Sequence, residues 1–496
     1  MAKTDSVLDY DKYKVRTSII DAFKKKRGEA APADIVAYTG LPKPQVDAEL
    51  PAVADEYSGR LKVTASGEII YSFPQGFKSR YKGFIPGFRK FSRALGKAAA
   101  ATGTFLFKAW IMLMLVGYFA IFVALIILAA LASVAVSATD KNNRNRGRGG
   151  IGSLALASRL IDLTLRIWFY NEVFKGPGQR RYEADIRARK RENRRPLHKA
   201  IFSFVFGEAD PNAGQAELER QAFASLVKVK KGMILLEEFM AISGLSPGEA
   251  DLAINRFLYE FEGSPEVTED GTVYYHFPKL LLRARADEHG ASDSPLKRLR
   301  SFSANAKKAN LTYVAINGFN FLFGSYFLFN SLAYSAAVSS GINGFNYLFY
   351  FTGQLLSELG VKALPLMGFG LGLVPIVFSI LFWLIPAIRS GKLKRENEKI
   401  KTENMQRILY ASALAKPEAF GIPDEKQLPS AARPGNAKLV SKAVEELAAY
   451  EGAEALGGNS WQLKELARKM DDLEKQRASV KPGDYELGAI AFDSGI

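Results

Sequence analysis

The chain contains one sequence pattern twice, at a fixed separation. The first copy runs from Gly40 to Pro74 and the second from Gly244 to Pro278, which is 204 positions later (244 − 40). The separation does not change along the pattern, and identical residues recur at the positions of Gly40, Gly59, Gly67, Tyr71, Phe73 and Pro74. The sequence therefore predicts two small domains of one kind.

Hydrophobic periodicity predicts the elements of each copy. The first copy favours helices over 13–26, 33–39 and 44–57, and then strands over 60–64 and 68–73. The second copy favours the same order, with helices from about 215 to 227, over 234–242 and over 247–261, and strands over 266–268 and 272–277. Three helices followed by a β-hairpin is the order of a winged-helix domain.

Each second strand ends in aromatic residues, which we expect in the domain core: Tyr71, Phe73, Tyr275 and Phe277. His276 alternates with these residues, so we expect its side chain to point away from the core and to be exposed.

Two apolar blocks lie outside the repeated pattern. Residues 104–138 carry no charge except Lys108, and residues 311–388 are also largely apolar. About 20 apolar residues, each rising 1.5 Å, cross a hydrocarbon core of about 30 Å. The blocks therefore predict membrane segments, and the second divides into spans over 311–335 and 364–388 with an aromatic segment over 341–359 between them.

Cations are concentrated beside these blocks. The net charge is +16, and the stretches before both blocks combine basic and aromatic residues. Such stretches suit the headgroup region of a bilayer, and we expect lipid contacts from Lys78, Arg80, Lys82, Arg89, Lys90, Arg93, Lys297, Arg298 and Arg300. Basic residues mixed with aromatic ones can also bind single-stranded nucleic acid. Their position directly before apolar blocks favours an anionic lipid membrane as the partner.

The first membrane block includes a later apolar stretch, over 151–174, in which charged residues interrupt the apolar pattern. Arg159, Asp162 and Arg166 fall on one helical face, which indicates either an interfacial helix or a span with a buried polar face. If every basic flank lies in the cytosol, each block crosses an even number of times. The polar N-terminal residues lack a signal-peptide pattern, so we expect soluble domains in the cytosol and a location in the cytoplasmic (inner) membrane.

Beyond residue 390 we expect a cytosolic helical tail. Residues 395–414 favour a helix, 416–436 a proline-containing linker, and 438–477 a helical stretch broken at Gly457 and Gly458, while the last residues favour disorder. The expected divisions are 1–75 (first winged-helix-like domain), 76–103 (basic juxtamembrane segment), 104–175 (first membrane block), 176–198 (basic linker), 199–280 (second winged-helix-like domain), 281–310 (basic linker), 311–389 (second membrane block) and 390–496 (tail).

The sequence offers no candidate for catalysis. There is no cysteine, which excludes thiolate ligands, and the three histidines are scattered. No nucleotide-binding, metalloprotease or nucleophile motif occurs. A cation site at Glu208, Asp210 and Asn212 is conceivable, but the surrounding residues favour a simple turn. We therefore predict no enzyme activity, no cofactor and no metal.

The third predicted helix of each copy is acidic. Winged-helix proteins that bind DNA use this helix and need cations on it, yet Arg256 is the one cation within 44–57 and 247–261. This composition disfavours nucleic acid as a partner and favours protein interaction.

The run from Phe202 to Asn212, followed by the second copy's hairpin, resembles a membrane-protein family of cyanobacteria and plant chloroplasts. The resemblance covers most of residues 15–400 and implies paired winged-helix-like units with membrane segments. Plant members are loosely labelled as iron–sulfur cluster biosynthesis proteins. Because this chain has no cysteine, the resemblance transfers no ligand residue.

These observations predict an α+β protein with integral membrane helices and two winged-helix-like cytosolic domains. We expect a polytopic scaffold or regulator that binds other proteins. The alternatives are a membrane-tethered nucleic-acid-binding protein, and a transport or lipid-handling component.

Overall fold

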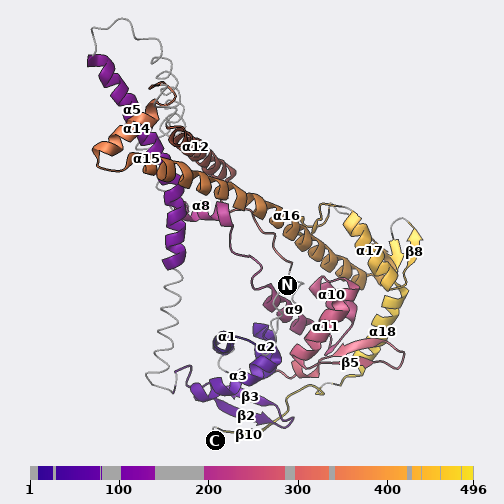
Figure 1. Ribbon diagram of the computed structural model, residues 1–496. Coiled ribbons are helices and arrows are strands. Elements are labelled where there is room, and N and C mark those ends of the chain that lie inside the picture. The colour runs from indigo at the N-terminus through magenta and orange to yellow at the C-terminus, as the bar shows by residue number, and fades with distance from the viewer. Residues whose placement is uncertain are drawn as a thin grey trace, which may run out of the picture. The chain divides into compact units, whose positions relative to one another are not determined.

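The computed structural model of the protein combines helices with small antiparallel sheets, as an α+β chain should (Figure 1). The chain divides into two compact units, with unit 1 formed by residues 1–91, 210–300 and 394–496 and unit 2 by residues 92–209 and 301–393. The structure describes residues 9–25, 29–78, 80, 102–139, 195–284, 296–334, 341–421, 427–436, 438–457, 460–481 and 483–494, without the side chains of 134–139.

Unit 1 begins with a segment that we name the first module. Its elements are α1 (Lys12–Lys25), β1 (Glu29–Ala30), α2 (Pro32–Thr39), α3 (Lys43–Glu56), β2 (Arg60–Thr64) and β3 (Ile69–Ser72). The strands form a sheet in the order β1-β3-β2. The three helices and the hairpin agree with the sequence prediction, whereas the two-residue strand β1 is too short to leave a periodic signal.

The second module repeats this order. Its elements are α9 (Gln215–Val229), β4 (Met233–Ile234), α10 (Leu236–Ser243), α11 (Pro247–Phe261), β5 (Ser264–Val267), β6 (Val273–His276) and the short helix η2 (Pro278–Leu280). Its sheet has the order β4-β6-β5. The aromatic residues expected in the core are buried in both modules: Tyr71, Phe73, Tyr275 and Phe277.

Matching side chains begin and end the second helix of each module. The Asp34 carboxylate accepts the Ala31 amide at 2.9 Å, and the Glu238 carboxylate accepts the Leu235 amide at 3.0 Å, so each satisfies a free N–H at a helix N-terminus. Each helix ends at a left-handed glycine, Gly40 in the first module (φ 69°) and the equivalent glycine in the second.

The tail is not simply helical, because it contains a third sheet. Its elements are the C-terminal part of α16 (Val374–Ala415), η4 (Pro417–Ala419), β7 (Phe420–Gly421), η5 (Ser430–Ala432), α17 (Lys438–Tyr450), β8 (Glu454–Gly457), β9 (Ser460–Gln462) and α18 (Lys464–Ser479). The sheet has the order β7-β9-β8, which matches the other two sheets. Gly457 therefore lies at a hairpin and does not merely break a helix. We name residues 394–463 the third module.

Two strands of the third module match strands of the second at a separation of 186 positions (420 − 234). Ile234 pairs with Tyr275 in the second sheet, and Phe420 pairs with Trp461 in the third. Leu463 takes the place of Phe277, and both are fully buried. The separation is 186 for these positions, whereas β8 lies 190 positions after β5 (455 − 265), so the third module carries a four-residue insertion before β8.

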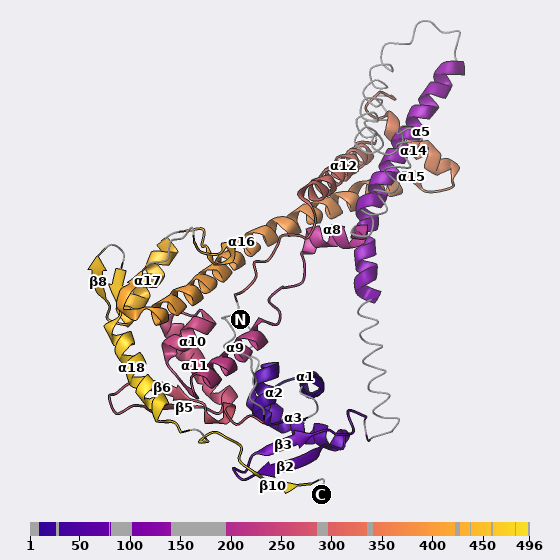
Figure 2. The ribbon, with the colours of Figure 1, turned by 180° about the vertical axis from the view of Figure 1, so that it is seen from behind.

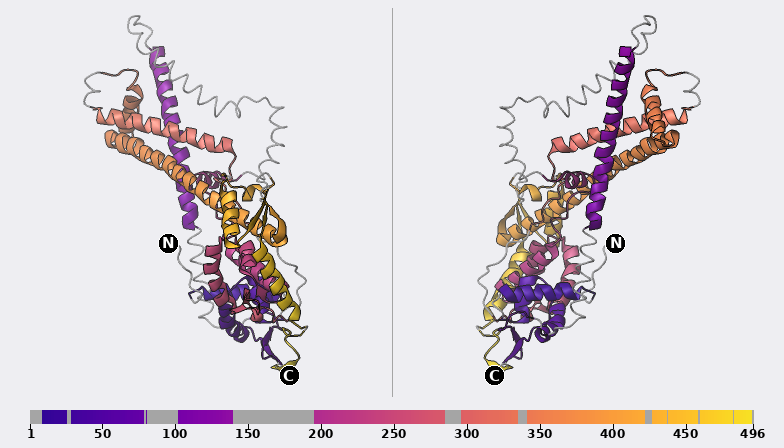
Figure 3. Two further views of the ribbon diagram at one scale, coloured as in Figure 1. Left: turned by 90° about the vertical axis from the view of Figure 1, so that its right-hand side faces the viewer. Right: turned by 90° about the vertical axis from the view of Figure 1, so that its left-hand side faces the viewer.

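The last described residues form a strand instead of a disordered tail. Strand β10 (Ile490–Asp493) pairs antiparallel with β2 and extends the first sheet to the order β1-β3-β2-β10. The C-terminus accordingly lies beside the strands of the first module (Figures 2 and 3).

Unit 2 is helical in its described part. Its elements are η1 (Leu113–Gly117), α5 (Tyr118–Thr139), α8 (Leu197–Phe206), α12 (Lys307–Leu332), α14 (Tyr347–Glu358), α15 (Ala363–Pro365), η3 (Leu366–Leu373) and the start of α16. Helix α16 continues without a break past residue 389, where we expected the second membrane block to end, and α8 belongs to unit 2 although we expected the second soluble domain from residue 199.

Candidate functional site

The first and second modules meet where α2 ends against α9. Gly40 approaches α9 so closely that a Cβ atom there would collide with the backbone carbonyl of Glu217. One turn further along α9, the Gln221 side-chain amide donates to the Tyr38 carbonyl at 2.8 Å. A glycine and a neutral hydrogen bond lie at the centre of the first junction, and the ion pairs Lys14–Glu217 (3.4 Å) and Lys43–Glu262 (3.1 Å) also join the two modules.

The second and third modules meet in the same way. A Cβ atom on Gly244 would collide with the backbone carbonyl of Glu403 in α16. One turn further along, Arg407 donates to the Ile242 carbonyl at 2.7 Å. Glu403 and Arg407 lie 186 positions after Glu217 and Gln221 (407 − 221), so the second junction repeats the first.

The polar chemistry of the second junction is much richer. Arg407 is fully buried and also donates to the Ser243 carbonyl at 2.9 Å and to the carboxylate of Glu219. Burial lowers the pKa of the Arg407 guanidinium, and the nearby Glu219 and Glu403 oppose that change. A charge buried in this way is stable only with such partners.

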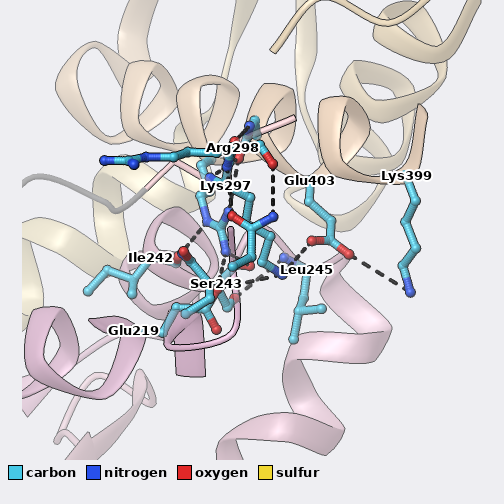
Figure 4. A network of polar contacts seen from close by, with 12 residues as sticks. Glu219, Ile242, Ser243, Leu245, Lys297, Arg298, Lys399 and Glu403 are labelled. Atoms are coloured by element: carbon cyan, nitrogen blue, oxygen red, sulfur yellow. Dashed lines mark hydrogen bonds and ion pairs between the residues drawn. The ribbon is translucent and has the colours of Figure 1, made fainter. Parts of the chain in front are cut away.

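Residue Lys297, one of the expected lipid contacts, completes this network. Its ammonium lies 2.6 Å from Glu403, which Lys399 approaches from the other side at 3.8 Å (Figure 4). Its backbone exchanges two 2.8 Å hydrogen bonds with the buried Asn404 side chain. Lys297 therefore ties the segment before the second block to α16.

Arg300 is held in a similar way. It donates to Glu396 at 2.6 Å, and its backbone exchanges two 2.9 Å hydrogen bonds with Asn397. Between them, Arg298 is exposed and binds Asn212 only through its backbone. Asn212 thus has a structural contact in the turn that the sequence predicted.

The remaining sequence-predicted residues divide into two groups. Lys78 and Arg80 are exposed, as lipid contact would require. The others lie outside the described residues: Lys82, Arg89, Lys90, Arg93, Arg159, Asp162 and Arg166.

The cations on the third helices are engaged by carboxylates. Lys43, at the start of α3, lies 2.6 Å from Asp47 and 3.1 Å from Glu262 at the end of α11. On α11, Arg256 donates at 2.6 Å to the buried Glu260 carboxylate. These ion pairs neutralise the charges that a phosphate backbone would otherwise attract.

The outer face of α11 carries two exposed apolar side chains. Leu252 is 75% exposed and Tyr259 is 54% exposed. They lie seven residues apart and therefore on one helical face. Large exposed side chains at this spacing are typical of a surface that binds protein.

A buried cluster of charges joins α10 to the third module. Lys469 of α18 lies 2.8 Å from Glu237 of α10 and 3.1 Å from Glu451, which follows α17. Burial and the neighbouring Glu237 raise the pKa of Glu451 to about 8, because the ionised form is poorly solvated and faces a like charge. Glu451 therefore holds its proton to a higher pH than an ordinary glutamate, and it shares the lysine with Glu237.

His276 is more constrained than an exposed strand residue. Its Nδ1 atom lies 2.9 Å from Glu266, and its Nε2 atom lies 3.0 Å from the Tyr485 hydroxyl. It points away from the core as expected, but the C-terminal segment covers it.

In unit 2, two of the described helices contain a stretch that is long and apolar enough to cross a membrane. These helices are Thr102–Ser133 and Ala363–Ala415, and only 22% and 33% of their most apolar windows are buried. The expected span over 311–335 corresponds to α12, which is long enough but does not meet the same criterion. The buried asparagines Asn317, Asn320 and Asn330 of α12 lower its hydropathy.

Several polar side chains in this unit donate hydrogen bonds to backbone carbonyls. Asn320 donates to the Leu115 carbonyl in the π-helical turn η1 at 2.7 Å, and Tyr118 donates to the Gly370 carbonyl in the π-helical turn η3 at 2.8 Å. A π-helical turn leaves a carbonyl without its usual partner, and in an apolar environment that carbonyl needs another donor.

The first five residues of the run that carries the family resemblance, Phe202 to Phe206, form the C-terminal half of α8. Phe204 packs in an apolar cluster with Tyr313 and Phe382. Arg389 donates to the carbonyls of Phe204 at 2.7 Å and of Val205 at 3.2 Å, so it caps the C-terminus of α8. The apolar residues of this run therefore have a packing role within unit 2.

Comparison with known proteins finds a similarity that covers most of the chain. The chain is 23% identical to an uncharacterized chloroplastic protein of Arabidopsis thaliana over 423 residues, which cover 82% of this chain and 73% of the relative. No family model matches the chain. No solved structure matches it either.

This similarity supports the expected relation to plant chloroplast proteins. It does not support the expected cytoplasmic membrane, because the relative's name places that protein in the chloroplast. It assigns no residue a role.

Sequence reasoning missed the two junctions and the third module. Gly40 and Gly244 were visible as repeated residues, and each approaches a glutamate, but the donors one turn later, Gln221 and Arg407, differ in residue type. Within the described ranges, no group of three or more acidic or histidine side chains could hold a metal ion.

Proposed function

We propose that this chain is a membrane-anchored scaffold whose winged-helix modules bind other proteins. Helix, strand, two helices and a hairpin, with the third strand at the centre of the sheet, is the winged-helix arrangement. We assign this fold to the first and second modules. The shared strand order, with β7 and β9 lying 186 positions after their counterparts β4 and β6, extends the assignment to a degenerate third module.

The third helices carry the argument for protein partners. A winged helix that binds DNA inserts its third helix into the major groove, which needs free cations. Here Lys43 and Arg256 are paired with carboxylates, and the outer face of α11 presents Leu252 and Tyr259. Aromatic and aliphatic side chains of this kind are the usual anchors of protein interfaces.

The anchor is proposed from the apolar helices. The Thr102–Ser133 helix and the unit 2 part of the Ala363–Ala415 helix each contain an apolar window long enough to cross a membrane, and most of each window is exposed. Lys78, Arg80 and Arg298 are exposed cations that could meet anionic lipid. The proposal includes no catalytic step.

The test is site-specific photocrosslinking in native membranes. A photoreactive residue at Leu252 or Tyr259 of the full chain should give discrete protein adducts that survive nuclease treatment. The control position is Glu269, which is exposed on the turn between β5 and β6. Adducts that nuclease removes, or identical adducts at all three positions, would overturn the proposal.

A further inference from the structure

Strand β10 is held on the first module mainly by its backbone. Ser494 donates its N–H to the Leu61 carbonyl at 2.9 Å, and the Leu61 N–H donates to the Ser494 hydroxyl at 2.8 Å. At the other end of the strand, Ala65 donates to the Ala489 carbonyl at 2.8 Å. The outward-facing N–H and C=O groups of β2 are thereby occupied.

The side chains of this strand contribute little to the attachment. Ile490 is 52% exposed and Phe492 is 59% exposed. The register shifts between these two residues, so the ladder is irregular. In the segment leading to β10, Leu487 is buried against Ala31 and Ile70. A strand bound in this way buries little apolar surface and can be replaced by another strand.

The equivalent edge of the second module contains a proline. Pro265 of β5 occupies the position of Leu61, 204 residues later (265 − 61). Proline has no N–H, so a strand at this edge would lack the hydrogen bond that Leu61 donates in the first module. Helix α18 also holds the adjacent turn, because Asp472 accepts the Thr268 hydroxyl and Arg468 donates to the Asp270 carbonyl at 3.2 Å.

We propose that the β2 edge is a docking site for an extended segment of a partner protein, and that β10 occupies this edge until the partner displaces it. Every residue of β2 has a backbone N–H, unlike Pro265 in β5. If β10 leaves, the free edge of β2 therefore favours pairing with another strand. The proposal deepens the scaffold function, on which it rests, by naming a second binding surface.

The residues of β2 indicate what the partner segment contains. Lys62 faces Asp493 across the β2–β10 pair, and Arg60 adds a second, exposed cation. Val63 and Thr64 face Phe492 and Ile490. The preferred segment is therefore a strand with alternating apolar residues followed by an acidic residue, as in β10 itself.

The binding experiment uses the full chain in detergent and a chain that ends at Gly488. The probe is a fluorescent peptide with the sequence of residues 486–496. We expect the shortened chain to bind the peptide at least tenfold more tightly than the full chain, because the edge is free. A peptide with Asp493→Lys should bind more weakly than the parent peptide.

Leu61→Pro in the shortened chain converts the edge to the form found in the second module. We expect this variant to lose peptide binding, whereas Leu61→Ala, which keeps the N–H, should retain it. Equal binding by the full and shortened chains, or binding that survives Leu61→Pro, would overturn the proposal.

Two further measurements identify the occupant. A photoreactive residue at Arg60 should give a protein adduct in native membranes that increases in the shortened chain and disappears with Leu61→Pro. If instead the full chain forms dimers that require residues 489–496, as light scattering would detect, the occupant is a second copy and the proposal is wrong. Photocrosslinking at Leu252 and Tyr259 is independent of this edge, so failure here is distinguishable from failure of the scaffold function.

Discussion

The two junctions of unit 1 have the same geometry and different chemistry. In both, a left-handed glycine lies against the backbone of the next module's first helix, and a side chain one turn later binds a carbonyl near the end of the preceding helix. At the first junction that side chain is Gln221, and at the second it is Arg407 with its carboxylate partner Glu219.

This difference separates what the packing requires from what it tolerates. The close approach at Gly40 and Gly244 is common to both junctions, so it belongs to the way the modules stack. The donor one turn later is a neutral amide at the first junction and a buried cation at the second, so the shared geometry does not require a charged donor. Four predictions test this distinction.

Arg407→Gln should have the largest effect. It makes the second junction resemble the first, but it removes the guanidinium from the Ser243 carbonyl and from the Glu219 carboxylate, which keeps the longer contacts with Lys297 at 3.6 Å and with Gln215 at 3.5 Å. We expect a loss of roughly 3 to 4 kcal/mol in local stability. Hydrogen exchange of the α10 and α17 amides in the full chain would measure it.

The matched control is Lys442→Gln, which removes an exposed ion pair with Glu446 at 3.5 Å. Such pairs contribute at most about 0.5 kcal/mol on a helix surface. Equal effects of the two variants would show that the Arg407 network does not stabilise the junction.

Gly40→Ala and Gly244→Ala should destabilise both junctions to a similar extent, by roughly 2 to 3 kcal/mol. Each substitution places a Cβ atom on a residue with a left-handed backbone, and that atom collides with the first helix of the next module. Gly67→Ala is the control, because Gly67 is also left-handed (φ 81°) but has open space around its Cβ position. Its cost should be about 1 kcal/mol, and thermal unfolding of all three variants would compare them.

Glu451→Gln should change the pH dependence of stability around the second junction. The folded pKa of Glu451, about 8, lies above its ordinary value of 4.5. The folded state therefore holds a proton that the unfolded state releases, and stability falls as pH rises from about 4.5 to about 8. The glutamine variant should lose this slope and be more stable than the wild type at pH 9, by on the order of 1 kcal/mol.

Melting temperatures between pH 5 and pH 9 would test this prediction. Parallel curves for the variant and the wild type would contradict it. The buried pair formed by Lys469 with Glu237 remains in the variant, so its own contribution cancels in the comparison.

Gln221→Ala should have the smallest effect, about 1 kcal/mol, because it removes one neutral hydrogen bond to Tyr38. Hydrogen exchange of the α2 amides would detect it. An effect as large as that of Arg407→Gln would mean that charge is not what distinguishes the junctions.

The sequence predicted the first two modules well, because their signals are strong. Buried aromatic residues such as Tyr71 and Tyr275 recur at a fixed separation, and glycines mark the helix ends. The strands β1 and β4 were not predicted, since two residues are too few for a period.

The third module was hidden because its counterparts differ in residue type. Trp461 replaces Tyr275, Leu463 replaces Phe277, and the short helix η5 stands between β7 and α17, where the second module has α10. Strand β10 was hidden for another reason, because its apolar side chains are exposed and its attachment depends on backbone groups that no side-chain pattern reveals.

The separation along the chain between the partners at each junction also has a consequence for biosynthesis. Tyr38 and Gln221 are 183 residues apart, and Ile242 and Arg407 are 165 residues apart. At 5 to 20 residues per second, a ribosome needs roughly 10 to 35 seconds to supply the second partner. Each module must therefore wait, with its glycine face uncovered, while the intervening apolar block is made, and the order of translation sets the order of assembly.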